Sequence, residues 1–160
     1  MIMDEKNCEI LKILHKNSRT SLTEISNSVG LSIDAVNKRI QKMIEHKIFA
    51  PTVLLRHRYC GFHNVVEIKV KLQNLDKEEE FTRFISYLKE HSRVTEVFSI
   101  AGEWDMTIVL LARDAIEQGK ITQKMRTKFG KIIASWSESL TITAHKFEDY
   151  DFKRMFLEEV

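Results

Sequence analysis

Residues 21–47 read SLTEISNSVGLSIDAVNKRIQKMIEHK, and this stretch decides the fold of the N-terminal part of the chain. It predicts two short helices separated by a turn at Gly30, because glycine tolerates the positive φ of a tight turn. Ser21 and Glu24 form the S-x-x-E pattern of a capping box, and Ser32 is placed to cap the second helix. This outline is that of a helix-turn-helix, whose second helix enters the major groove of DNA.

The helix expected after Ser32 has an apolar and a polar face. At 3.6 residues per turn, Val36, Ile40 and Met43 cluster on the inner side. The outer side holds six polar residues, Asp34, Asn37, Lys38, Gln41, Lys42 and Glu45. Asparagine and glutamine pair with adenine through two hydrogen bonds, and lysine reaches guanine or phosphate. The face therefore suits DNA, although an ordinary solvated helix face has the same composition.

The candidate DNA contacts divide into two kinds. We expect the bases to be read by Asn37, Lys38 and Gln41. We expect the phosphates to be held by residues at the helix starts and on the flanks of the second helix, namely Arg19, Ser21, Ser32, Arg39 and Lys42. Arg39 projects between the buried and the open face, so a structural salt bridge is the alternative for this residue.

Charge is distributed unevenly along the 160-residue chain, whose formal net charge is +2. The first 60 residues hold ten Lys/Arg against six Asp/Glu, a net of +4. The other hundred residues hold 15 against 17, a net of −2. A basic N-terminal part followed by a mildly acidic remainder of the chain fits DNA binding confined to the first third of the chain.

Composition argues against several other classes of protein. Cys8 and Cys60 are isolated, so neither a disulfide scaffold nor a zinc ribbon is expected. The longest apolar run, residues 106–112, is far shorter than the roughly 20 residues that span a membrane. The N-terminus does not resemble a signal peptide. We expect a cytoplasmic protein without a metal site or a cofactor.

A first helix is expected from Asp4 to Asn17, and with the two helices described above it completes a three-helix domain. Pro51 breaks the helical pattern, and residues 52–58 read as a strand-like connector. We divide the chain into a helix-turn-helix domain (1–50), the connector (51–62), a second domain (63–147) and a C-terminal extension (148–160).

The second domain shows a different periodicity. Residues 63–72 alternate between apolar and polar side chains, and residues 94–100 and 106–112 also read as strands, the latter apolar on both faces and so central. One helix is expected after a cap formed by Asp76 and Glu79, and another over residues 115–129 with Ile116, Ile121, Met125 and Phe129 inside. A long last strand is expected from 132 to 147. The resulting order β-α-β-β-α-β is that of a ferredoxin-like domain, and the fold class is α+β.

Both helices of such a domain lie on one face of the sheet, so the other face is open. Along the last strand the odd positions form a row of hydroxyls, from Ser135 to Thr143. We expect this row to share the open face with Thr95, Val97, Ser99, Thr107, Val109 and Leu111. Such a surface is too apolar to remain exposed to solvent, and it predicts a homodimer in which the two sheets pack together. The alternative is that serine and threonine are simply good strand formers.

The whole arrangement resembles the leucine-responsive regulator / AsnC family of prokaryotic transcription regulators. The resemblance covers residues 3–147 and includes a winged-type helix-turn-helix followed by a ferredoxin-like domain. Its carriers in the first half are Asp4, Ile10-Leu11, Leu14, Arg19, Gly30-Leu31-Ser32, Val36, Arg39-Ile40 and Ile48. In the second half they are Val94, Val97 and the hairpin Gly102-Glu103-Trp104-Asp105.

The resemblance implies a DNA-binding regulator that forms dimers, tetramers or octamers and binds a small effector, usually an amino acid, between subunits. Carried across, the effector positions are Gly102, Trp104 and Asp105. Asp105 is suited to pair with an α-ammonium group, and Trp104 offers an apolar wall with one donor. An ordinary tight hairpin would require the same glycine and aspartate.

The sequence departs from the family in three places. Lys47 stands where the family usually has a glycine cap, which predicts a less sharp end to the recognition helix. Glu138 adds an unexpected charge to the last strand, where it would repel an effector carboxylate. Residues 148–160 extend past the usual end and suggest either a short helix against a neighbouring subunit or a frayed tail.

The leading hypothesis is a regulator of double-stranded DNA that is not an enzyme. A ligand sensor acting through protein partners is the second possibility. The third is an enzyme similar to the sirohaem decarboxylases, but the histidine that those proteins carry after the Val-Thr pair is absent after Val94-Thr95.

Overall fold

The computed structural model describes residues 3–74 and 78–158. The chain divides into two compact units, one made of Met1–Leu54 with Lys146–Val160 and the other of Leu55–His145. Within the described residues no helix is long and apolar enough to cross a membrane.

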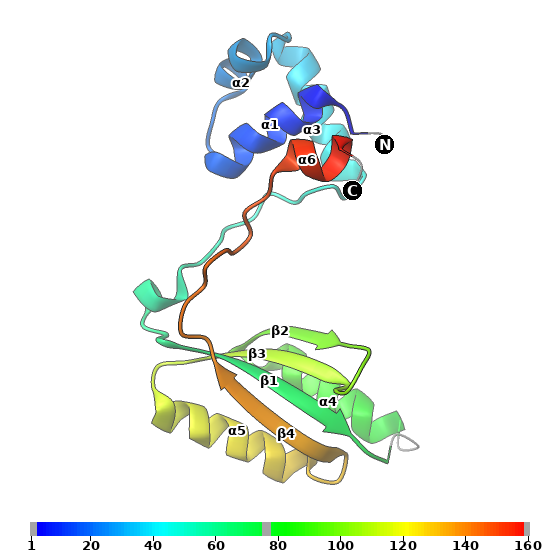
Figure 1. Cartoon of the computed structure of the whole chain (residues 1–160), viewed down its shortest axis with the longest axis vertical. Coiled ribbons are helices and arrows are strands. Elements are labelled where there is room, and N and C mark those ends of the chain that lie inside the picture. The colour runs from blue at the N-terminus through cyan, green and yellow to red at the C-terminus, as the bar shows by residue number, and fades with distance from the viewer. Residues whose placement is uncertain (1–2, 75–77, 159–160) are drawn as a thin grey trace. The chain divides into compact units, whose positions relative to one another are not determined.

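The first unit is helical (Figure 1). Its elements are α1 (Glu5–Lys16), α2 (Leu22–Val29), α3 (Ile33–Glu45) and the C-terminal α6 (Phe152–Leu157). The predicted first helix is confirmed, with Asp4 as its N-cap and Asn17 as its C-cap. Its core is formed by Ile10, Leu11, Ile25, Val29, Val36 and Met43. No strand follows α3 in residues 46–54, so the described part of this unit contains no β-hairpin wing.

The predicted strand-like connector is not a strand. Residues 51–56 carry no regular secondary structure, and η1 (His57–Cys60) is a 3₁₀ turn. Val53, Leu54 and Leu55 are exposed. A strand needs a neighbour to satisfy its backbone groups, and none of the described strands pairs with this segment.

The second unit is an antiparallel sheet in the order β2-β3-β1-β4 with two helices on one face (Figure 1). Its elements are β1 (Asn64–Leu72), α4 (Glu78–Glu90), β2 (Val94–Ser99), β3 (Met106–Ala112), α5 (Ala115–Phe129) and β4 (Ile133–Leu140). The core joins alternate residues of the two central strands to both helices, for example Ile68, Ile108, Phe84 and Phe129. This is the predicted βαββαβ order, and β3 is central as predicted.

Two expectations about this unit are wrong in detail, and one cannot be compared. β4 ends at Leu140 rather than 147: the Thr141 N–H still donates to the Val65 carbonyl at 2.9 Å, but β1 begins at Asn64, so the residues after 142 have no strand to pair with. Ile116 is 70% exposed, since it lies about half a turn around α5 from the buried Met125. The predicted cap at Asp76 falls outside the described residues.

The open face of the sheet also differs from the expected one. A bulge between Val94 and Glu96 shifts the register of β2, so Val97 and Ser99 pair with the core-facing Ile108 and Met106. The residues of β2 on the open face therefore include Glu96 and Phe98 but not Val97 and Ser99, while Thr95 lies in the bulge and donates its hydroxyl to the Val109 carbonyl at 3.4 Å. Phe98 is 50% exposed.

Candidate DNA-binding and effector sites

The turn between α2 and α3 is held by local hydrogen bonds. The Ser21 hydroxyl and backbone N–H both donate to Glu24 Oε2 at 2.9 Å, and the Glu24 N–H donates to Ser21 Oγ at 3.2 Å. Gly30 adopts φ +69°, the left-handed conformation that glycine favours. The Ser26 hydroxyl donates to the Leu31 carbonyl at 2.6 Å. These bonds fix the start of α3 relative to α2.

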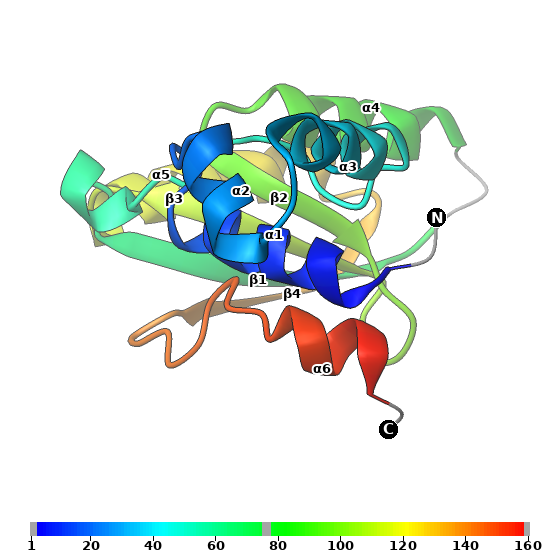
Figure 2. The ribbon, with the colours of Figure 1, turned by 90° about the horizontal axis from the view of Figure 1, so that it is seen from above.

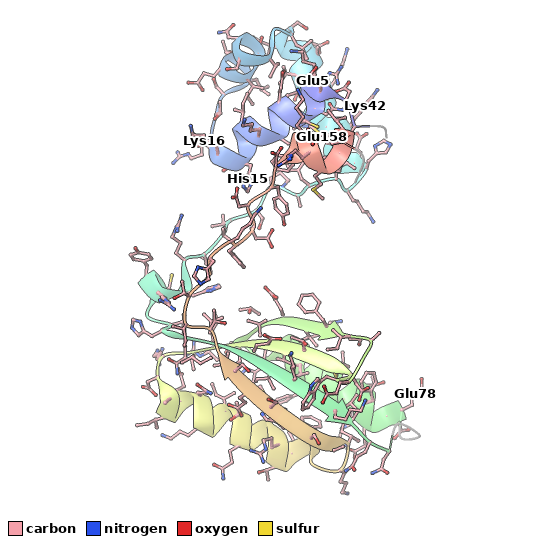
Figure 3. All side chains as sticks on the ribbon, viewed as in Figure 1. Glu5, His15, Lys16, Lys42, Glu78 and Glu158 are labelled. Carbon is pink, nitrogen blue, oxygen red and sulfur yellow. The ribbon has the colours of Figure 1, made fainter. Side chains whose placement is uncertain are left out.

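The outward face of α3 is exposed where DNA contacts were predicted. Asn37, Gln41 and Lys42 are exposed, and Figure 3 shows Lys42 projecting at the surface of the unit. Lys38 is also exposed, but its ammonium lies 2.8 Å from Asp34 one turn earlier. The hydrogen bond to Asp34 raises the pKa of Lys38. Because this pair is solvated, a DNA phosphate can replace the carboxylate at small cost.

The structure adds Ile33 to this face. Ile33 opens α3, is 48% exposed and lies one turn before Asn37 on the same side of the helix. An apolar side chain at the N-terminal end of a recognition helix is able to contact a thymine methyl group. Ile33 follows the same spacing as Val36, Ile40 and Met43, so the sequence alone assigns it to the inner stripe, and only its exposure at the start of α3 reveals it.

Three residues predicted to hold phosphates have structural partners in the first unit. The Arg39 Nη1 donates to Asp4 Oδ2 at 2.7 Å and to Asn7 Oδ1 at 2.9 Å, so Arg39 makes the salt bridge considered as its alternative role. Partial burial raises the pKa of Asp4, but the hydrogen bonds from Arg39 and from the Asn7 N–H outweigh it, and the net shift is downward. The hydroxyls of Ser21 and Ser32 accept backbone N–H groups as helix caps.

Arg19 remains exposed before α2. Its backbone N–H is bound by Asn17 Oδ1 at 3.1 Å, and none of the hydrogen bonds found in the described residues involves its guanidinium. This leaves Arg19 and Lys42 as the predicted phosphate contacts whose side chains project from the unit without a role in its folding.

The end of α3 is sharp, contrary to the expectation from Lys47. Lys47 adopts φ +57°, in the left-handed region usual for glycine. The Ile48 N–H donates to the Met43 carbonyl at 2.9 Å, and the Lys47 N–H donates to that of Ile44 at 2.9 Å. Packing of Ile48 and Phe49 on the core of the unit compensates for the absent glycine.

The hairpin between β2 and β3 brings Gly102, Trp104 and Asp105 together. Gly102 has φ +132°, a conformation that side chains with a Cβ rarely adopt. Asp105 Oδ2 accepts the Leu72 N–H at 2.8 Å, and its Oδ1 accepts the Lys71 ammonium at 3.0 Å. The Leu72 N–H, followed by Lys71, lowers the pKa of Asp105. Asp105 therefore holds the hairpin against the end of β1, which is the structural role expected of an ordinary tight hairpin. Trp104 is half-buried.

Glu138 faces α5 rather than a solvent-filled site. Its Oε1 accepts the Trp136 indole N–H at 2.8 Å, and its Oε2 accepts the Gln118 amide at 2.9 Å. Gln118 in turn accepts from the Asn64 amide at 3.1 Å. This network explains the charge in the last strand, because each oxygen of the half-buried carboxylate has a donor.

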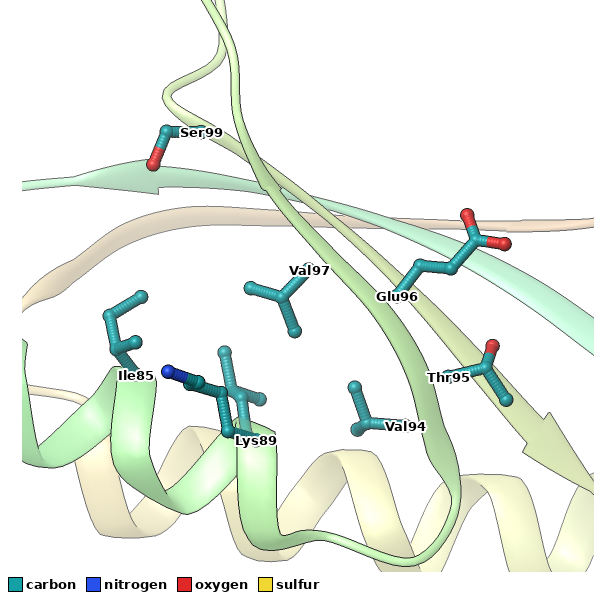
Figure 4. Close-up of a pocket in the computed structure, with 8 residues that line it drawn as sticks. Ile85, Lys89, Val94, Thr95, Glu96, Val97 and Ser99 are labelled. Carbon is teal, nitrogen blue, oxygen red and sulfur yellow. The ribbon is translucent and has the colours of Figure 1, made fainter. Parts of the chain in front are cut away.

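A groove of about 480 Å³ lies between α4 and the edge strand β2 (Figure 4). Its lining is mixed: the apolar residues are Ile85, Leu88, Val94 and Val97, and the polar ones are Lys89, Thr95, Glu96 and Ser99. A volume of this size accommodates a small ligand. The groove therefore competes with the hairpin as a place for an effector.

The C-terminal extension packs on the first unit of its own chain. α6 lies against α1 (Figures 1 and 2). The Cys8 thiol donates to the Phe152 carbonyl at 3.5 Å, and Lys153 pairs with Glu5 at 2.6 Å. The His15 ring meets those of Tyr150 and Phe152 edge-on at 5.8 and 5.5 Å, and Figure 3 shows His15 beside the tail. Neither expectation for this segment, a helix on a neighbouring subunit or a frayed tail, anticipated this contact.

Comparison with known proteins identifies the family to which this chain belongs. Residues 3–44 match the AsnC-type helix-turn-helix domain. The regulator LrpA of Pyrococcus horikoshii is 30% identical over 132 residues, which cover 82% of this chain and 89% of LrpA. The chain belongs to the leucine-responsive regulator / AsnC family. As a member of the Lrp/AsnC family it is a transcriptional regulator of the helix-turn-helix type.

Solved Lrp/AsnC structures share the fold over nearly the whole chain. AsnC of E. coli superposes with a TM-score of 0.82 at 17% identity and covers 94% of this chain and 99% of its own. A transcriptional regulator from Neisseria meningitidis, solved as a complex with L-Met, superposes with a TM-score of 0.81 at 18% identity and covers 91% and 93%. Both agree with a helix-turn-helix unit followed by a four-stranded antiparallel sheet with helices.

Proposed function

We propose that this Lrp/AsnC chain is a sequence-specific regulator that binds duplex DNA as a dimer and responds to an amino acid. The exposed face of α3, set at a fixed angle by the capped turn, is the observation that carries the proposal. Ile33, Asn37, Lys38 and Gln41 read the bases, and Lys42 with Arg19 holds phosphates. Ser21 and Ser32 contribute through the helix starts they cap, and Arg39 contributes by fixing α3 on α1.

The dimer forms through the open face of the sheet. Phe98 is half-exposed there and Val109 of β3 is partly exposed beside it, whereas Leu111 is already buried within the chain. The hydroxyl row of β4 and a Glu67–Lys69 pair, 3.9 Å apart, complete the face. An exposed aromatic side chain within a mixed polar face suits the centre of a homodimer surface. Two recognition helices then meet half-sites about one helical turn apart, or a multiple of it.

The effector binds at the hairpin of Gly102, Trp104 and Asp105, between subunits. The L-Met complex of the Neisseria regulator supports an amino acid as the ligand class. Asp105 has spare lone pairs for an α-ammonium even while it holds Lys71 and the Leu72 N–H. Binding of the effector would shift the balance between dimers and larger assemblies, and so between DNA-bound states.

The decisive experiment is selection of genomic DNA fragments by the purified protein at about 0.15 M salt. A shared near-palindrome among the recovered fragments supports the proposal, and Gln41→Ala should change the preferred bases while Lys42→Ala weakens binding to all sequences. Recovery of nothing specific, with and without an amino-acid mixture, would leave the sensor acting through protein partners as the better account.

Three variants locate the effector and the dimer. Asp105→Ala should reduce the thermal shift given by the effector, and Lys89→Ala in the α4–β2 groove is its matched control. The reverse result would move the effector to the groove. Phe98→Glu should dissociate the dimer in gel filtration with light scattering, and an unchanged mass would remove the open face as the interface.

A further inference from the structure

Cations gather on α5 in a part of the chain that is otherwise acidic. Residues 61–160 hold 15 Lys/Arg, and five of these fall between residues 120 and 131. From 119 to 137 the sequence contains no Asp or Glu, whereas the remaining residues of 61–160 hold ten cations against 17 acids. The five are Lys120, Lys124, Arg126, Lys128 and Lys131.

Three of these lysines form a stripe along the outer face of α5. Lys120, Lys124 and Lys128 follow one another at i, i+4 and i+8, so they share one side of the helix and span about 12 Å along its axis. Met125 and Phe129 are buried on the opposite side. A groove of about 400 Å³ runs along the stripe and is also lined by Gln123 and Thr127, so all five of its residues carry hydrogen-bonding groups.

The stripe is not neutralised within its own unit. The ion pairs found among the described residues include Lys71, Arg93 and Arg113 of the same unit, but none of the five cations on and after α5. Among the described residues, the Lys128 ammonium lies over two aromatic rings, Tyr87 at 4.3 Å and Phe129 at 5.4 Å. A cation–π contact of this kind orients a lysine without removing its charge.

A row of uncompensated like charges is stabilised by a polyanion. None of the five residues that line the groove has an apolar or aromatic side chain of the kind that anchors the centre of a protein–protein interface. Lysines act as point charges on phosphates and do not require the paired geometry of a carboxylate. Evenly spaced lysines beside amide and hydroxyl donors match the repeating phosphates of a nucleic-acid backbone.

We propose that the lysine stripe of α5 (Lys120, Lys124 and Lys128) is a second DNA contact, which binds backbone phosphates of duplex DNA outside the half-sites read by α3. The proposal rests on the proposed function, because it assumes that α3 first holds the DNA. The stripe adds affinity without sequence preference, and only on DNA long enough to reach from the half-sites to α5.

The test compares the full-length protein with a triple variant, Lys120→Gln, Lys124→Gln and Lys128→Gln. Its matched control is the triple Lys→Arg variant, which keeps the charge at the same positions. Each binds a selected DNA site on a duplex of about 30 base pairs, just over the span of two half-sites, and on the same site with long flanks. Dissociation constants are measured over a series of KCl concentrations.

The Gln variant should match the wild type on the short duplex and lose the extra affinity on the long one. On long DNA, the slope of log K against log salt should become less steep by about 0.9 for each phosphate that the variant no longer binds, up to about 2.7 per protomer. The Arg variant should retain the wild-type slope.

Equal slopes for the Gln variant and the wild type on long DNA would overturn the proposal. A changed elution volume in gel filtration with an unchanged slope would also overturn it, and would assign the stripe to the acidic residues of a second copy. A wild type that binds no duplex at any salt concentration would defeat the proposed function together with the stripe. Wild-type binding with an unaffected Gln variant defeats the stripe alone.

Discussion

The contact between the C-terminal tail and α1 makes the DNA-binding unit depend on both ends of the chain. We predict that Phe152→Ala opens this contact and destabilises the first unit. The Phe152 ring is half-buried on the core of the unit and meets the His15 ring edge-on at 5.5 Å. Its backbone carbonyl also accepts the Cys8 thiol at 3.5 Å.

The magnitude follows from burial. Full burial of a phenylalanine side chain contributes about 3 kcal/mol, so half-burial contributes about 1.5 kcal/mol. The edge-on ring contact adds about 0.5 kcal/mol. A loss of about 2 kcal/mol in a unit of this size lowers its unfolding temperature by about 10 °C. The sheet unit should keep its own transition, because Phe152 has no part in its core.

The assay uses Cys8 as an internal reporter of opening. Cys8 is 4% exposed, and burial is the largest of the effects that raise the pKa of its thiol, so it should react slowly with a thiol reagent in the folded protein. In a Cys60→Ser background, which removes the exposed thiol, Phe152→Ala should speed the labelling of Cys8 about 30-fold if opening limits the reaction.

The control is Met155→Ala, on the same short helix but 61% exposed, which should leave the labelling rate near that of the wild type. Fast labelling of Cys8 in the wild type would refute the reasoning, since it would mean that the tail does not stay on α1. Equal rates in Phe152→Ala and Met155→Ala would refute the energetic part of it.

Three further predictions concern the two units separately. Lys47→Gly should raise the free energy of unfolding of the first unit by about 0.5–1 kcal/mol, because glycine adopts the positive φ of this cap without strain. Chemical denaturation measures this gain. A loss of stability would show that the lysine side chain stabilises the cap. Arg39→Met should lower the free energy of unfolding of the first unit by about 1 kcal/mol after solvent screening, because it removes the pair with Asp4. The slope of log K for DNA against log salt should stay unchanged. A slope less steep by about 0.9 would instead make Arg39 a phosphate contact. Burial, followed by the charges of Lys124 and Arg93, lowers the pKa of His91 below its ordinary 6.5, so the folded state favours the neutral ring. The sheet unit should therefore keep full stability above about pH 6.5 and lose stability as the pH falls below that value, and His91→Gln should flatten this part of the thermal-melt profile; identical profiles for the two proteins would remove His91 as the cause.

The sequence by itself determined the local elements and their order. The caps at Ser21 and Ser32 were predicted correctly because capping depends on residues about three positions apart. The strands β1 and β3 and the helix α5 followed from side-chain periodicity, which is also local. The motifs that indicate the family also lie at fixed spacings along the chain, so the family could be inferred from the sequence.

Tertiary structure alone decided which residues of these elements meet. The bulge in β2 depends on its register against β3, and it places Phe98 rather than Val97 on the open face. Arg39 joins Asp4 because α1 packs beside α3, and no spacing along the chain reveals a contact 35 residues apart. The docking of Phe152 on Cys8, 144 residues away, is of the same kind. Periodicity and capping report on neighbours along the chain, whereas register and packing depend on partners that only the folded chain brings together.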